Sequence, residues 1–169
     1  MTIDTSLLRL EKVKNYKSVP FAHLQQLYEF EFSTVTHYEL NPDGLYDPEM
    51  LKSHWSKQGV DIYVLYYKAI PIGFTVVNLA SMIDGDPHKK DIAEMFVMPN
   101  YRRQHVGEWM TYKIFAMYKG SWEVRQLAGL AKARAFWLRV IERFTQNQFE
   151  ELHLNNDVWH GTLQRFEAK

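Results

Sequence analysis

The sequence contains no cysteine among its 169 residues. This absence excludes a disulfide framework, a thiol nucleophile and thiolate-based zinc or iron–sulfur sites. It also lacks a run of about 18 apolar residues, the length that a membrane-spanning helix requires, so we expect no membrane partner. The first residues, MTIDTSLLRLEKVK, lack the basic region followed by an apolar stretch that is typical of a secretory signal. Together these absences favour a cytoplasmic protein.

The chain has no excess of charge of either sign, with 20 basic and 20 acidic residues. This balance argues against a dedicated nucleic-acid-binding protein. The charges are nevertheless unevenly spread. Residues 101–143 contain nine basic and three acidic residues, a net charge of +6, whereas residues 29–61 contain seven acidic and two basic residues, a net charge of −5. Scattered solvated charge explains this pattern as well as one surface for an anion and another for a cation.

The apolar content is sufficient for a folded domain, since 46% of the residues are hydrophobic and ten Phe, ten Tyr and five Trp are present. The length is typical of one domain over residues 1–169. Hydrophobic periodicity and turn residues predict the elements. Strands are expected over 6–14, 61–69, 70–80, 91–98, 122–127, 149–156 and 161–168, and helices from Ser18 to about Phe32 and over 47–59, 106–118 and 132–145. This order predicts an α/β or α+β domain with a mixed sheet.

The most informative stretch is DIAEMFVMPNYRRQHVGEWM, residues 91–110. It predicts a strand that enters a short basic loop and then a helix. Unpaired N–H groups and the helix dipole make a helix N-terminus suitable for phosphate. Arg102 and Arg103 add positive charge, and Gly107 permits close approach of a ligand to the backbone. The alternative is a solvated connection without a ligand.

These residues resemble the acyl-CoA motif of the GNAT superfamily of N-acetyltransferases, Gln/Arg-x-x-Gly-x-Gly/Ala after a strand ending in a Val-x-Pro-like pattern. Arg102 and Gly107 match the first and last positions, whereas His105 replaces the central glycine. The segment LAKARAFW, residues 130–137, is similar to the family's Asn-x-x-Ala-x-x-Phe-Tyr, with Leu130 in place of Asn and Trp137 in place of Tyr. The element order is similar over nearly the whole chain, and WEVRQL with FWLRVI resembles a bacterial subgroup of acetyltransferases with unassigned substrates.

The resemblance implies a mostly antiparallel sheet of about six to seven strands flanked by helices, and transfer of an acetyl group from acetyl-CoA to a primary amine. It places acetyl-CoA between strands 91–98 and 122–127, with its pyrophosphate on the loop. The implied cofactor-binding residues are Phe96, Val97, Arg102, Arg103, Gln104, His105, Val106 and Gly107. The acceptor is expected to be a small-molecule amine, and the net charge of residues 29–61 favours a cationic one. A homodimer is common in the family and stays open here.

Amine attack on a thioester needs a general base, and Glu94 and Glu123 are the candidates. For each, a solvated or salt-bridged strand residue is the alternative. The family's acid for the leaving thiolate falls on Trp137, so that role is vacant or moved. The departures at His105, Leu130 and Trp137 therefore keep a rival hypothesis open, a catalytically inactive acyl-CoA-binding or regulatory module. The seven histidines show no metal-binding spacing, so no metal is expected.

Overall fold

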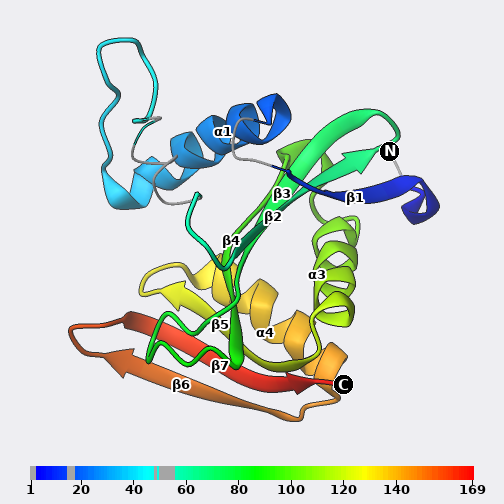
Figure 1. Cartoon of the computed structure of the whole chain (residues 1–169), viewed down its shortest axis with the longest axis vertical. Coiled ribbons are helices and arrows are strands. Elements are labelled where there is room, and N and C mark those ends of the chain that lie inside the picture. The colour runs from blue at the N-terminus through cyan, green and yellow to red at the C-terminus, as the bar shows by residue number, and fades with distance from the viewer. Residues whose placement is uncertain (1–2, 15–17, 48, 50–55) are drawn as a thin grey trace. The chain divides into compact units, whose positions relative to one another are not determined.

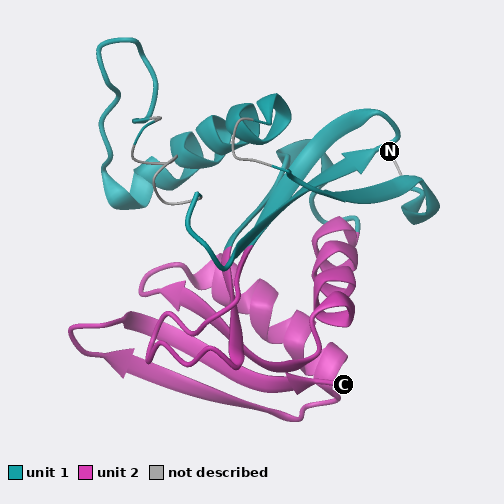
Figure 2. Cartoon of the chain, viewed as in Figure 1, with its two compact units in different colours: residues 1–76, 94–104 teal, residues 77–93, 105–169 magenta. Residues whose placement is uncertain are grey.

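The computed structural model describes residues 3–14, 18–47, 49 and 56–169. Its contacts divide the chain into two compact units (Figure 2). Unit 1 comprises Met1–Val76 and Glu94–Gln104, and unit 2 comprises Val77–Ala93 and His105–Lys169. Most of the helix predicted over 47–59 lies outside the described residues. The prediction of a single domain over 1–169 stays a prediction.

The described elements form a seven-stranded sheet with three helices and two short 3₁₀ turns (Figure 1). The strands are hydrogen-bonded in the order β1-β2-β3-β4-β5-β7-β6. β4 and β5 are parallel, whereas β1 with β2, β5 with β7 and β6 with β7 are antiparallel. The predicted mixed sheet flanked by helices is thereby confirmed. The bounds are η1 Thr5–Leu7, β1 Leu8–Lys12, α1 Val19–Thr36, β2 Val60–Tyr67, β3 Ile70–Asn78, β4 Lys89–Val97, η2 Pro99–Tyr101, α3 Val106–Met117, β5 Gly120–Leu127, α4 Ala131–Thr145, β6 Phe149–Asn155 and β7 His160–Ala168.

In unit 1 the inner face of α1 packs against the sheet through aromatic side chains. The ring of Phe21 meets that of Phe74 on β3 edge-on, with centroids 5.2 Å apart. β3 and β4 approach closely at Gly73, where an added Cβ would lie 2.4 Å from the carbonyl oxygen of Phe96. A side chain does not fit there without a shift of the backbone, so Gly73 brings the C-terminal end of β4 close to β3.

In unit 2 the amphipathic helix α4 covers the face formed by β5, β6 and β7. Its side chains Trp137, Val140 and Ile141 are buried, as expected for the apolar face of an amphipathic helix. β5 lies between β7 and the start of β4, and its pairing with β4 joins Lys89–Ile92 to Ser121–Val124. This arrangement places β5 at the centre of the unit. No helix in the described part of the chain is long and apolar enough to span a membrane.

Candidate active site

Glu94 lies on the part of β4 that belongs to unit 1, and its carboxylate accepts a hydrogen bond from the hydroxyl of Tyr28 on α1. The hydroxyl of Thr75 on β3 donates to the carbonyl oxygen of Glu94 over 3.0 Å. The strand backbone and the side chain of Glu94 are therefore both held by neighbouring elements. The sequence predicted Glu94 as a candidate base, whereas it placed Tyr28 only within the helix expected from Ser18 to about Phe32.

The ring of Tyr28 is enclosed by aromatic side chains of α1, β3 and β4. It stacks on Phe32 with centroids 5.4 Å apart and planes at 15°, and it meets Phe74 and Phe96 edge-on at 5.7 and 6.1 Å. Burial raises the pKa of Tyr28 far above its ordinary value, and the negative charge of Glu94 raises it further. The phenol is therefore protonated across the physiological range and acts as the donor to Glu94.

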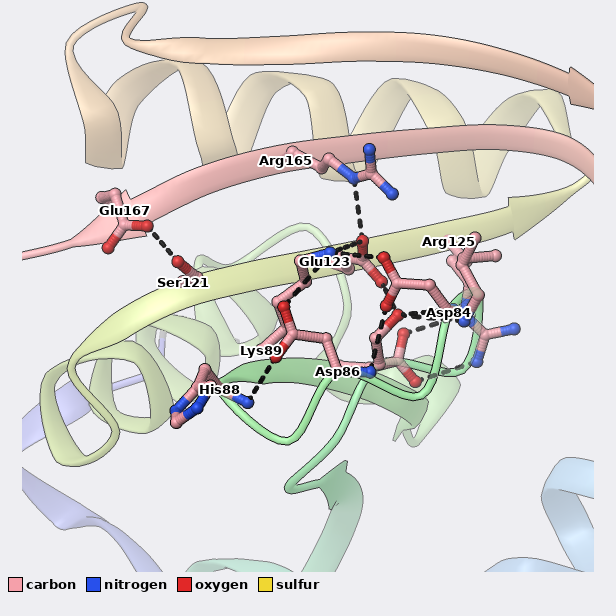
Figure 3. A network of polar contacts seen from close by, with 12 residues as sticks. Asp84, Asp86, His88, Lys89, Ser121, Glu123, Arg125, Arg165 and Glu167 are labelled. Atoms are coloured by element: carbon pink, nitrogen blue, oxygen red, sulfur yellow. Dashed lines mark hydrogen bonds and ion pairs between the residues drawn. The ribbon is translucent and has the colours of Figure 1, made fainter.

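Glu123, the second candidate base, lies on β5 in unit 2 and is fully buried. Its Oε1 accepts from Nε of Arg165 over 2.8 Å, and its Oε2 accepts from Oγ of Ser81 over 2.6 Å. Nζ of Lys89 lies 3.9 Å from Oε1 and 2.5 Å from Asp84 (Figure 3). These contacts join the segment between β3 and β4 to the centre of unit 2. Both carboxylate oxygens of Glu123 thus take part in a structural network.

A second buried acid in unit 2 was not predicted from the sequence. Asp91 on β4 is fully buried and accepts two hydrogen bonds from Arg125, at 2.9 and 2.8 Å, and one from Asn78 at 3.2 Å. The guanidinium of Arg125 also lies over the ring of Trp159, 4.4 Å from its centroid. The Arg125 guanidinium and the Asp91 carboxylate thus form an ion pair within unit 2.

The predicted phosphate-binding loop leads directly into the N-terminus of α3. The backbones of Arg103 and His105 both adopt the left-handed conformation, with φ of 59° and 62°. His105 directly precedes α3. The first backbone hydrogen bond of the helix runs from the N–H of Trp109 to the carbonyl oxygen of His105. The N–H groups of Val106 and Gly107 therefore precede the first residue that has an intrahelical acceptor. A helix N-terminus concentrates N–H donors, which suits a phosphate group.

Arg102, the first residue of the motif, is engaged within unit 1. Its Nε donates to the carbonyl oxygen of Val97 over 2.6 Å, and its two terminal nitrogens donate to the carboxylate of Glu31 over 2.7 and 2.6 Å. The guanidinium lies 5.5 Å from the ring centroid of Phe96. Hydrogen bonding to Arg102 lowers the pKa of Glu31. Arg102 thus ties the end of β4 to α1, a role that the motif alone did not indicate.

The other predicted cofactor-binding side chains differ in exposure. Phe96 and Val97 are buried, and Arg103 is exposed. Gln104 donates to the carbonyl oxygen of Asn100 over 3.0 Å, whereas its buried Oε1 has no hydrogen-bond partner. An unsatisfied buried acceptor beside the loop is consistent with a donor supplied by a ligand or water.

The side chain of His105 is exposed and bonds through Nδ1 to Glu108 over 2.9 Å. Glu108 also accepts from Arg143 at 3.2 Å and from Tyr112 at 3.2 Å. Burial acts to raise the pKa of Glu108, but the hydrogen bonds from His105, Arg143 and Tyr112 outweigh it and the net pKa is lowered. The structure therefore gives His105 a partner of its own, next to the first turn of α3.

Trp137, which stands at the position of the family's tyrosine, is buried in α4 and packs edge-on against Phe136 at 5.2 Å. A cavity of about 330 Å³ lies against β1 and β2 in unit 1, and none of its lining residues belongs to the predicted site. Within the described ranges, no three histidine or acidic side chains converge as a metal site would require.

Comparisons with known proteins give structural matches only. No family model matches the chain, and no curated protein matches it. An acetyltransferase from Thermus thermophilus has a TM-score of 0.69 at 13% identity, covering 99% of both chains. PaiA N-acetyltransferase from Thermoplasma acidophilum, solved with coenzyme A, has a TM-score of 0.63 at 9% identity, covering 95% of this chain and 98% of that one. An aminoglycoside acetyltransferase from a soil metagenome, solved with sisomicin, has a TM-score of 0.60 at 16% identity, covering 80% and 88%.

The matching structures include acetyltransferases of the GNAT family. The chain therefore has the GNAT fold, as the resemblance implied. At these identities the likeness shows the fold alone.

Proposed function

We propose that this chain is an N-acyltransferase that moves an acetyl group from acetyl-CoA to a primary amine. The observation that carries the proposal is the carboxylate of Glu94, held on β4 by the half-buried Tyr28 in a fold shared with acetyltransferases. A cytoplasmic location, as predicted from the sequence, belongs to the same proposal.

Binding of acetyl-CoA is assigned to the backbone of the loop that precedes α3. The first N–H groups of α3, which follow the left-handed His105 in unit 2, provide donors for the pyrophosphate. The net charge of +6 over residues 101–143 favours a ligand with several phosphate charges, although salt screens this attraction. The predicted placement of the pantetheine of acetyl-CoA between β4 and β5 would involve residues of both units, and it stays a prediction.

The chemical step begins with an amine that must lose a proton. For an amine with the pKa of lysine, about 10.4, forming the neutral amine at pH 7 costs about 4.6 kcal/mol. The nitrogen forms a bond to the thioester carbonyl carbon, the carbon–sulfur bond breaks, and the amine proton passes to Glu94. The sulfur leaves as the thiolate, which takes a proton from solvent, since Trp137 has no proton to supply at useful pKa.

Glu94 is a better candidate base than Glu123 because of what surrounds each carboxylate. Glu123 is fully buried and bridges Ser81 and Arg165 within unit 2. Glu94 is only partly buried. We therefore assign proton transfer to Glu94 and a structural role to Glu123.

The acceptor is proposed to be a small cationic amine. The net charge of −5 over residues 29–61 creates a negative potential that concentrates cations. Within that stretch Glu29 is buried on α1, and burial raises its pKa. A neighbouring ammonium group would offset this cost of burial. The structural match to an aminoglycoside acetyltransferase supports an amine-bearing acceptor.

The rival function is an acyl-CoA-binding module without catalysis, and the buried Trp137 favours it because no tyrosine occupies that position. The two are separated by calorimetric titration of acetyl-CoA followed by thiol-release assays with polyamines, amino sugars, amino acids and basic peptides. Binding without turnover on any amine favours the module, and a preference for acidic acceptors contradicts the cationic assignment.

The assignment of the base is tested by Glu94→Gln. We expect turnover to fall by about 10²–10⁴ with acetyl-CoA affinity nearly unchanged. Glu150→Gln, at an exposed position on β6, is the matched control and should leave both quantities unchanged. A fully active Glu94→Gln enzyme transfers the role to Glu123 or to a water chain.

A further inference from the structure

We propose that Tyr28 is a positioning residue for the general base, in which its hydroxyl holds the Glu94 carboxylate in one orientation and keeps it ready to accept a proton. The inference rests on the proposed function, because it gives Tyr28 a role in the step assigned to Glu94. It goes beyond the resemblance, which gives the residue at position 28 no part in the reaction.

Tyr28 has little freedom to move. Its ring is stacked on Phe32 and bounded by Phe74 and Phe96, three contacts that come from α1, β3 and β4. Aromatic side chains have only two rotatable bonds, so packing of the ring fixes the hydroxyl as well. The hydroxyl is directed at Oε2 of Glu94, 66 positions away in the sequence.

Glu94 is held at both ends. Thr75 fixes its carbonyl oxygen and Tyr28 fixes its carboxylate, so the side chain that joins the two groups has a restricted set of rotamers. A base that is already oriented loses less entropy when the acceptor binds, and displacement of a catalytic group by about 1 Å can cost about 10²-fold in rate.

Burial and, after it, nearby negative charges keep the Tyr28 hydroxyl protonated. Glu29 and Glu31 on α1 and Glu94 on β4 all act electrostatically on Tyr28, and Glu31 is paired with Arg102 from the segment after β4. These negative charges and burial oppose ionisation of the phenol. Tyr28 therefore remains a donor, and a donor favours the ionised form of the carboxylate that accepts a proton.

The test is Tyr28→Phe, which keeps the ring and removes only the hydroxyl. We expect kcat to fall about tenfold, with acetyl-CoA affinity unchanged. We also expect the acidic limb of the pH–rate profile to move to higher pH, because a carboxylate that loses a donor binds its proton more tightly. Tyr46→Phe is the matched control, since it removes the hydroxyl of another unit 1 tyrosine, one that donates to Ser33 over 3.1 Å. It should leave the acidic limb in place.

Two further measurements separate positioning from packing and from failure of the proposed function. In a Glu94→Gln background, Tyr28→Phe should cause no additional loss of turnover, because the group that it orients is gone. A ¹³C carboxyl NMR titration, with Glu94→Gln identifying the resonance, should show Glu94 protonated at higher pH in Tyr28→Phe than in the original chain. This titration requires no activity, so it decides the role of Tyr28 even if no amine is acetylated.

An unchanged Glu94 titration together with an unchanged acidic limb in Tyr28→Phe would overturn the proposal. Full additivity of the two substitutions would also overturn it. Absence of acetyl transfer by the unmodified chain, with a shifted titration, would instead refute the proposed function and leave the link between Tyr28 and Glu94 standing.

Discussion

Replacement of Glu123 by glutamine tests whether this buried carboxylate is structural. The substitution preserves the volume of the side chain but removes its negative charge. It also places an amide nitrogen, which can only donate, where one carboxylate oxygen now accepts from Arg165 or Ser81. One of these two donors therefore loses its acceptor in the variant.

The expected loss of stability can be estimated from the contacts. Removing one partner of a fully buried ion pair costs about 3–5 kcal/mol, and a hydrogen bond to a charged group contributes about 1.5–3 kcal/mol. The side chains of Arg165 and Lys89 are 34% and 23% exposed, so water replaces part of the lost interaction. We therefore expect the free energy of unfolding to fall by about 2 kcal/mol, which lowers Tm by about 4–8 °C for a chain of this length.

Urea denaturation followed by circular dichroism measures this loss, and the thiol-release assay measures turnover per folded molecule. Glu167→Gln is the matched control, because Glu167 is an exposed carboxylate on β7 that bonds to Ser121, and its loss should cost less than about 0.5 kcal/mol. An unchanged unfolding midpoint combined with a large loss of turnover in Glu123→Gln would refute the structural role and identify Glu123 as the base.

Two other substitutions give sharp outcomes. Glu31→Gln should lower the free energy of unfolding by less than about 1 kcal/mol near pH 7. Hydrogen bonding to Arg102 lowers the pKa of Glu31 in the folded protein. The stabilisation is therefore complete above the ordinary pKa of about 4.3, and it is lost as the pH falls through the lower pKa of the folded state. Thermal unfolding at about pH 7 and about pH 3 checks this, and a difference that persists in acid contradicts it. His105→Gly should tighten acetyl-CoA binding by up to about tenfold, or about 1.4 kcal/mol, because a non-glycine residue at φ of 62° is strained. Weaker binding in calorimetry, with an affinity of the original chain that falls between about pH 5.5 and 7.5, would instead assign the imidazole a phosphate contact.

Local periodicity predicted most of the fold because it depends on neighbours in the sequence. The clearest case is the helix predicted over 132–145, which the structure places at Ala131–Thr145. The strand predicted over 122–127 begins two residues earlier, at Gly120, since its first residues pair with the end of β7. Such differences at the ends of strands arise because pairing with residues distant in the sequence, which local periodicity does not reveal, decides where a strand begins.

The candidate site was less predictable because its decisive contacts join distant residues. Tyr28 follows the helical spacing of the apolar residues around it, and nothing near it indicates that its hydroxyl meets Glu94. Arg102 fits a phosphate-binding motif, but its bond to Glu31 spans 71 positions. The sequence left two interpretations for Glu123, a general base or a solvated or salt-bridged strand residue, and its contacts with Ser81 and Arg165 come from segments distant in the sequence.

The two units are interleaved along the chain, which passes between them after Val76, Ala93 and Gln104. No single cut can therefore release either unit whole. A fragment that ends at Val76 loses Glu94, the partner of the Tyr28 hydroxyl, and a fragment that begins at His105 loses the residues that β5 pairs with in β4. Truncated polypeptides consequently cannot be used to assign cofactor binding and proton transfer to separate pieces, so point substitutions in the intact chain are the appropriate tool for dissecting this protein.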